Sequence, residues 1–232
     1  MTGDWGDKSV SVPAPCLLYL FAADVLPPAH FSLGQLFGTH HDVHLPCDRG
    51  RVALGPLEAH VLAWSFWQLH TDGAIKLEHD PSIARGRDVD WLGLDALARR
   101  VATAAPRSDL IEEQLFDVCP EEPTPISRIV LDWGHKRGVN AAKWIFLPLE
   151  AIEDEVHRDT CLALDLEPTA PSKSNIACAA IDALRPQFIE VKAAWVRFVD
   201  EDHQRADALV RCCDAGLSQL RPPKYASAMG GI

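Results

Sequence analysis

The stretch GPLEAHVLAWSFWQLHTDGAIKLE (residues 55–78) decides the fold class. Pro56 in the first turn and Glu58 near the positive end of the helix dipole favour a helix that begins here. Apolar side chains continue most of the way round this helix, which is typical of a helix buried at the centre of a domain. Gly73 then ends the helix, and the alternation over residues 74–78 predicts a strand. Helix, tight turn and strand together predict one winged-helix-like unit.

A second unit of the same kind is expected further along the chain. Thr124 is a good helix cap and Pro125 a good first helical residue, and apolar residues then repeat at helical spacing over residues 126–133. Gly138 favours the end of this helix. Residues 142–147 (AKWIFL) follow as an expected strand.

The remaining segments add helices on either side of these units. Residues 16–26 predict a helix or a buried strand, and residues 167–175 a loop. Further helices are expected over residues 91–104, 109–117, 175–184, 187–200 and 203–219. No β/α alternation is present, which argues against Rossmann and barrel architectures. We therefore predict a mainly α protein with short β-hairpins: a single helical domain over residues 14–220, with flexible tails at 1–13 and 221–232.

Charge and cysteine content narrow the classes of function. The 232 residues include 33 acidic and 22 basic side chains, for a net charge of −11. This charge argues against a general nucleic-acid binder and against electrostatic docking on an anionic membrane. The seven cysteines include no CxxC pair, and no signal peptide or membrane-spanning run is visible. We expect a cytoplasmic protein whose cysteines are mostly small buried apolar residues.

Three stretches of the chain resemble the Golgi phosphoprotein 3 (GPP34) family. They are VLAWSFWQLHTDGAIKLE (61–78), LGLDALARRVATAAPRSDLIEEQLFDV (92–118) and ISRIVLDWGHKRGVNAAKWIFL (126–147). The family is mostly helical, and its eukaryotic members bind a phosphoinositide head group on Golgi membranes. The resemblance implies a non-catalytic adaptor or ligand-binding protein.

The chain departs from this family at the phosphate site. The family uses a Trp and an Arg just before the first buried helix and two Arg on the later one. Here Arg49 and Arg51 precede the first helix without a Trp, and Arg128 is the one match on the later helix. The charged loop at 80–90 has no likeness to the family's membrane-entering hairpin. Because a phosphate site needs several converging donors, we expect phosphoinositide binding not to be retained.

The densest set of metal-ligating residue types is THHDVHLPC (39–47). His40 and His44 are four residues apart, which on a helix would place both rings on one face, and Cys47 could add a ligand that suits zinc. Pro46 argues against a helix here, so a polar surface loop is the alternative to a zinc site.

Aromatic and histidine residues around the first helix suggest a second candidate site. Trp64 and Trp67 could line a small-molecule pocket, with His60 and His70 as acid–base groups. The alternative is that the tryptophans pack in the core and the histidines stand at the helix boundaries. The acidic residues between 150 and 159, which include Asp159, are expected to form a solvated face, and Cys212 is expected to be exposed.

Three functions remain open from the sequence. The first is a Golgi phosphoprotein 3-like adaptor or ligand-binding protein, which would bind a small molecule or a protein and could form a homo-oligomer. The second is an enzyme with a Trp/His-lined pocket, with or without a metal. The third is a winged-helix DNA-binding regulator, for which Arg99–Arg100 and Lys136–Arg137 are the only basic pairs. Standard esterase and nucleotide-binding signatures are absent, so no nucleotide cofactor is expected.

Overall fold

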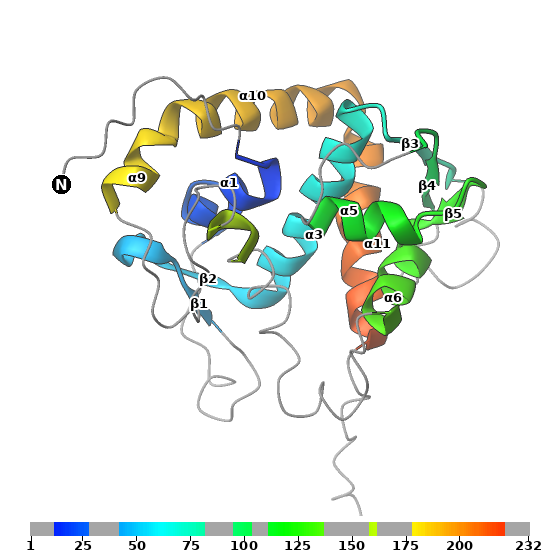
Figure 1. Cartoon of the computed structure of the whole chain (residues 1–232), viewed down its shortest axis with the longest axis horizontal. Coiled ribbons are helices and arrows are strands. Elements are labelled where there is room, and N and C mark those ends of the chain that lie inside the picture. Colours follow the sequence, from blue (N-terminus) through cyan, green and yellow to red (C-terminus); the bar gives the residue numbers. More distant parts are fainter. Residues whose placement is uncertain are drawn as a thin grey trace, which may run out of the picture.

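The computed structural model describes residues 12–27, 42–81, 95–103, 111–136, 158–161 and 178–220. Over these residues the fold is mostly helical, with two small antiparallel sheets (Figure 1). The mainly α prediction with short β-hairpins is therefore confirmed. Nearly all of the predicted tails, and the strand expected at 142–147, lie outside the described residues. In the described part of the chain, no helix is long and apolar enough to cross a membrane.

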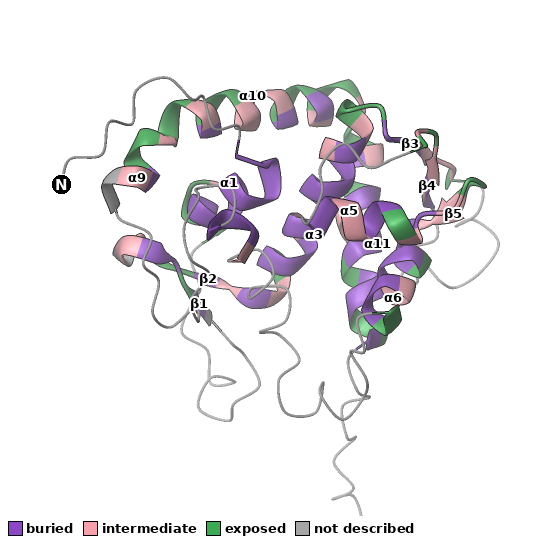
Figure 2. Cartoon of the chain, in the orientation of Figure 1, coloured by how far each residue is buried: buried purple, intermediate pink, exposed green. Residues whose placement is uncertain are grey.

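Helix α3 (Leu54–Thr71) forms the centre of the fold. It packs against α1 (Ala14–Leu20), α5 (Ile111–Val118) and α11 (His203–Leu220), and most of its length is buried (Figure 2). The backbone turns at Gly73, whose φ of +72° falls in the left-handed region that glycine adopts without strain. The predicted central helix and its terminating glycine are thus confirmed.

Two hairpins flank this helix. Strands β1 (Asp42–His44) and β2 (Arg51–Ala53) pair across a loop that contains the short 3-10 helix η2 (Pro46–Asp48). Another 3-10 turn, η1 (Ala22–Asp24), follows α1. Strand β3 (Ile75–His79) pairs with β4 (Ala96–Arg100), and the two-residue β5 (Thr124–Pro125) lies on the other side of β4. The strand predicted after Gly73 is confirmed as β3.

The helix expected over residues 91–104 is wrong where the structure describes it. Residues 96–100 form strand β4, with Ala98 opposite Leu77 of β3. Ala96 and Ala98 are buried while Leu97 between them is only partly buried, which is the period of a strand. Pairing with β3 therefore overrides the helix preference of an Ala- and Leu-rich segment.

The C-terminal half contains α6 (Ile126–Lys136), α9 (Cys178–Ala183), α10 (Arg185–Glu201) and α11. The three predicted closing helices are confirmed to within a few residues. The helix predicted from residue 126 is also confirmed. Thr124, however, does not cap that helix: it lies in β5, and its hydroxyl donates to the carbonyl of Glu122 at 3.0 Å.

Glycines set the contact between α6 and α11. A Cβ on Gly216 of α11 would lie 2.7 Å from the carbonyl oxygen of Ser127 and 2.7 Å from the Cβ of Val130, both on α6. Gly134 of α6 faces the side chain of Leu220 on α11. Each helix thus contributes a residue without a side chain, and the two backbones approach closely.

Candidate functional site

The predicted tryptophan site is a closed aromatic cluster. Trp64 and Trp67 of α3 meet Trp195 of α10, with each ring centroid 5.5 Å from that of Trp195. The ring centroid of Phe198, also on α10, is 5.5 Å from that of Trp195. Trp64 has no exposed surface, and the other three side chains are also buried. The cluster therefore corresponds to the core-packing interpretation of these tryptophans.

His60 and His70 make bonds within and just beyond their own helix. The His60 Nδ1–H donates to the carbonyl of Pro56 at 2.8 Å, and the His70 Nδ1–H to the carbonyl of Ile75 at 3.3 Å. Burial lowers the pKa of His60, and its bond to Pro56 only partly opposes this. His60 is therefore a neutral, donating ring near the start of α3, and His70 ties the end of α3 to β3.

The three predicted arginines are not brought together. Arg49 forms an ion pair with Asp182 of α9, and its guanidinium lies 5.0 Å from the ring centroid of Phe21. Arg51 is exposed on β2. Arg128, on α6, is 3.2 Å from Asp132 one turn on. Figure 1 places β2 and α6 at opposite sides of the molecule, so these cations cannot converge on one phosphate.

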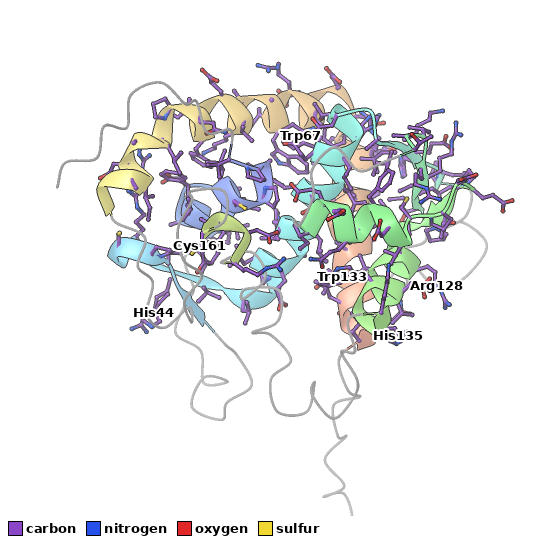
Figure 3. The ribbon with its side chains drawn as sticks, viewed as in Figure 1. His44, Trp67, Arg128, Trp133, His135 and Cys161 are labelled. Atoms are coloured by element: carbon purple, nitrogen blue, oxygen red, sulfur yellow. The ribbon has the colours of Figure 1, made fainter. Side chains whose placement is uncertain are left out.

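The predicted zinc set is also divided. His44 is exposed on β1, and Figure 3 shows it at the edge of the molecule. Cys47 takes part in a disulfide bond, and a sulfur so bonded is not the thiolate that zinc requires. His40 lies outside the described residues. Within the described ranges, no group of three or more His, Cys, Asp or Glu side chains could hold a metal ion.

A polar cluster around Asp95 joins the β3–β4 hairpin to α11. One carboxylate oxygen of Asp95 is 2.8 Å from Nη2 of Arg211 and 3.6 Å from Nε2 of His79. The other accepts from the thiol of Cys212 at 3.5 Å. Burial raises the pKa of Asp95, but bonds from Arg211 and the backbone more than offset this and the pKa is lowered overall. The carboxylate is therefore a buried, charged anchor.

The Asp95 cluster contains a histidine, a carboxylate and a thiol, but not a nucleophile. Cys212 has no exposed surface, which overturns the prediction that it is exposed. Helix α11 is covered on several sides by α3, α6, α10 and the hairpin, so adjacent cysteines on it can both be buried. Burial raises the pKa of Cys212 to about 12. A neutral, enclosed thiol does not attack a substrate.

Asp159 is another buried carboxylate, and it caps a helix far from it in sequence. Its side chain accepts from the backbone N–H of Ile111 at 2.7 Å, at the start of α5, and from Arg158 at 3.0 Å. Asp159 is fully buried, so the expected solvated acidic face is wrong at this residue. The helix N-terminus and the adjacent arginine compensate for its burial.

A cavity that could take a ligand is lined by residues that the structure describes. It lies between α5 and α6, with a volume of about 270 Å³ and a lining of Gln114, Asp117, Trp133 and Lys136. The indole N–H of Trp133 donates to the side-chain oxygen of Gln114 at 3.2 Å, which fixes the ring. Nζ of Lys136 is 3.7 Å from the carboxylate of Asp117, and both side chains are more than half exposed. The cavity thus combines an indole wall with one cation and one anion at its rim.

Sequence reasoning missed this cavity, although it had a signal. Gln114 and Asp117 are three residues apart on one helix, and Trp133 and Lys136 are three apart on the next. Such pairs share a helix face. The spacing within each helix does not predict that α5 and α6 pack with these two faces together.

Comparison of the chain with protein-family models, curated proteins and solved structures finds no match.

Proposed function

We propose that this chain is a non-catalytic binding protein of the Golgi phosphoprotein 3-like type, which takes a small zwitterionic ligand in the cavity between α5 and α6. The observation that carries this proposal is the lining of that cavity. Lys136 can meet a carboxylate and Asp117 an ammonium group, while the indole of Trp133 offers apolar surface between them.

The size of the cavity restricts the ligand class. Its 270 Å³ lies just below the range of about 300–1,000 Å³ that drug-sized ligands occupy. A free amino acid or a compound of similar size fits this volume and carries both charges. The existing contact between Lys136 and Asp117 is a half-exposed surface pair, which is worth at most about 1 kcal/mol and is easily replaced by a ligand.

Two observations favour binding over the alternatives. The Cys212 thiol beside Asp95 has its pKa raised to about 12, which argues against an enzyme that uses it as a nucleophile. For the DNA-binding alternative, Arg99 is paired with Glu78 and Arg100 with Glu121, so these cations are partly neutralised. We also propose that α3, β3 and β4 form a winged-helix-like unit.

We propose that the protein does not bind phosphoinositide head groups. Arg49 and Arg128 are each paired with a carboxylate and lie in different parts of the fold. Pelleting with vesicles that contain a phosphoinositide tests this directly. We expect the protein to remain in the supernatant at low salt, and stable pelleting would contradict us.

Thermal unfolding in the presence of each proteinogenic L-amino acid, at millimolar concentration, tests the binding role. A ligand that binds only the folded state raises the melting temperature. We expect at least one amino acid to do so, and Lys136→Gln to abolish the rise. Lys76→Gln is the matched control, because Lys76 is an exposed lysine on β3. No rise with any amino acid, or equal rises in Lys136→Gln and wild type, would contradict the proposal.

A further inference from the structure

Helix α10 has an apolar stripe on the face that points away from the molecule. Ile189 and Val196 are 57% and 45% exposed, and Ala193 between them is also exposed. These residues follow each other by four and three positions, so they share one side of the helix. Figure 2 shows this outer edge of α10 as a run of exposed residues, while Trp195 and Phe198 cover the core from the inner face.

The charges beside this stripe are arranged in opposite order about its middle. Helix α10 runs from Arg185 to Glu201, so Ala193 is its central residue. Glu190 lies three residues before Ala193 and Arg197 four residues after it, and both side chains are exposed. An anion on one half of the helix is thus matched, one residue offset, by a cation on the other half.

We propose that the chain forms a two-fold dimer in which α10 packs antiparallel against α10 of a second copy, with the helices crossing at Ala193. A two-fold interface must be complementary to itself, since each residue pair occurs twice. In this arrangement Ile189 of each copy packs beside Val196 of the other, and Glu190 of each copy faces Arg197 of the other.

The small residue at the crossing point supports this geometry. Two helices approach most closely where neither has a large side chain, and Ala193 is exposed at that point. The bulkier Ile189 and Val196 then fill the space on either side of the crossing. Glu190 and Arg197 sum to zero, so pairing these two side chains across the interface brings no excess of one sign together, although the whole chain carries −11.

A second copy is the occupant that this pattern fits best. A different partner would need its own complementary order of charges, whereas a copy of this chain provides it without further assumption. One helix per copy buries less than the roughly 800 Å² per partner of a standard interface. We therefore expect a weak dimer that dissociates on dilution, with a Kd of about micromolar order.

Sedimentation velocity over a dilution series of the full chain tests the proposal. Wild type should shift from dimer to monomer on dilution, and Ile189→Glu or Val196→Glu should raise the Kd by about tenfold or more. Val101→Glu is the matched control, because Val101 is 50% exposed but follows β4 and is not part of α10. Unchanged melting of each variant shows that the monomer is intact, since all three positions are exposed.

Charge exchange separates the proposed register from other modes of association. Glu190→Arg alone and Arg197→Glu alone should each weaken the dimer, and the double exchange should restore it. In addition, Ala193→Cys should cross-link the two copies under oxidation, while Gln204→Cys, exposed on α11, should not. A wild-type chain that stays monomeric at every concentration would overturn the proposal. So would a dimer that persists in both Ile189→Glu and Val196→Glu.

Discussion

The aromatic end of the molecule and the α6–α11 crossing are packed in opposite ways. At the aromatic end, Trp64 and Trp195 fill the space between α3 and α10 with the largest side chains available. At the crossing, Gly216 has no side chain and lets α11 approach the backbone of α6 closely, and Gly134 leaves room for the side chain of Leu220. The first region is therefore sensitive to loss of volume and the second to its gain.

Among these substitutions, Trp64→Ala should have the largest effect on the free energy of unfolding. It removes the ring that contacts both Trp67 and Trp195, so the free energy of unfolding should fall by about 3–5 kcal/mol in urea denaturation. Trp64→Phe should cost much less. It keeps an aromatic ring and loses an indole N–H that has no hydrogen-bond partner among the described residues. Equal losses from the two variants would contradict the packing role.

Gly216→Ala tests the opposite sensitivity. The added Cβ would meet the backbone carbonyl of Ser127 at 2.7 Å, and a backbone atom cannot easily move aside. We expect a loss of about 1–3 kcal/mol in the same urea assay. Gly134→Ala should cost less, because the three atoms nearest to its added Cβ belong to the side chain of Leu220 and not to backbone. A Gly134→Ala variant that is less stable than Gly216→Ala would contradict the assignment of Gly216 as the more restricted position of the crossing.

Asp95→Asn should have the next largest effect, because it weakens the anchor between the hairpin and α11. We expect a loss of about 1–2 kcal/mol at neutral pH. The pKa of Asp95 is lowered in the fold, so its contribution is fully present above the unfolded value of 3.8 and is lost as the pH falls through the folded pKa. Urea midpoints measured from neutral to acidic pH should therefore converge for wild type and variant. Parallel curves down to the lowest pH would contradict the role of the carboxylate.

His60→Gln is expected to have the smallest effect and a different pH range. Burial lowers the pKa of His60 in the fold, so the neutral ring stabilises the protein above the unfolded value of 6.5. This stabilisation is lost as the pH falls through the lowered folded pKa. The wild type should thus lose more stability than His60→Gln between neutral and mildly acidic pH, as seen in melting temperatures. A greater loss in the variant would mean that the ring gains a proton on folding.

The elements that sequence patterns predicted correctly are those with one dominant period. The predicted stripe of α10 has helical spacing and consists of Phe188, Val191, Trp195 and Phe198. Val191 is partly buried and the other three are buried. The segment at 96–100 failed because its small and apolar residues satisfy both a helical and a strand period. Its pairing with β3 depends on a partner twenty or so residues away, which local spacing does not contain.

The candidate sites were harder to predict, because they depend on how elements meet. Cys212 was expected to be exposed from its position on one helix, whereas α11 is enclosed on several sides. Asp159 has its partner at Ile111, 48 residues earlier. The hydrogen bond between Gln114 of α5 and Trp133 of α6 at the cavity likewise forms only when the two helices pack. In each case the sequence shows a residue of a type that can carry out chemistry, but it does not show which distant residue that side chain contacts.

We expect the ligand to bind between α5 and α6 and not at the tryptophan cluster. Indole N–H signals in ¹H–¹⁵N NMR spectra test it in one titration, after assignment by single Trp→Phe variants. On addition of a mixture of L-amino acids, the Trp133 signal should shift in a saturable way while those of Trp64, Trp67 and Trp195 stay in place. A saturable shift of the cluster signals with Trp133 unmoved would contradict the account.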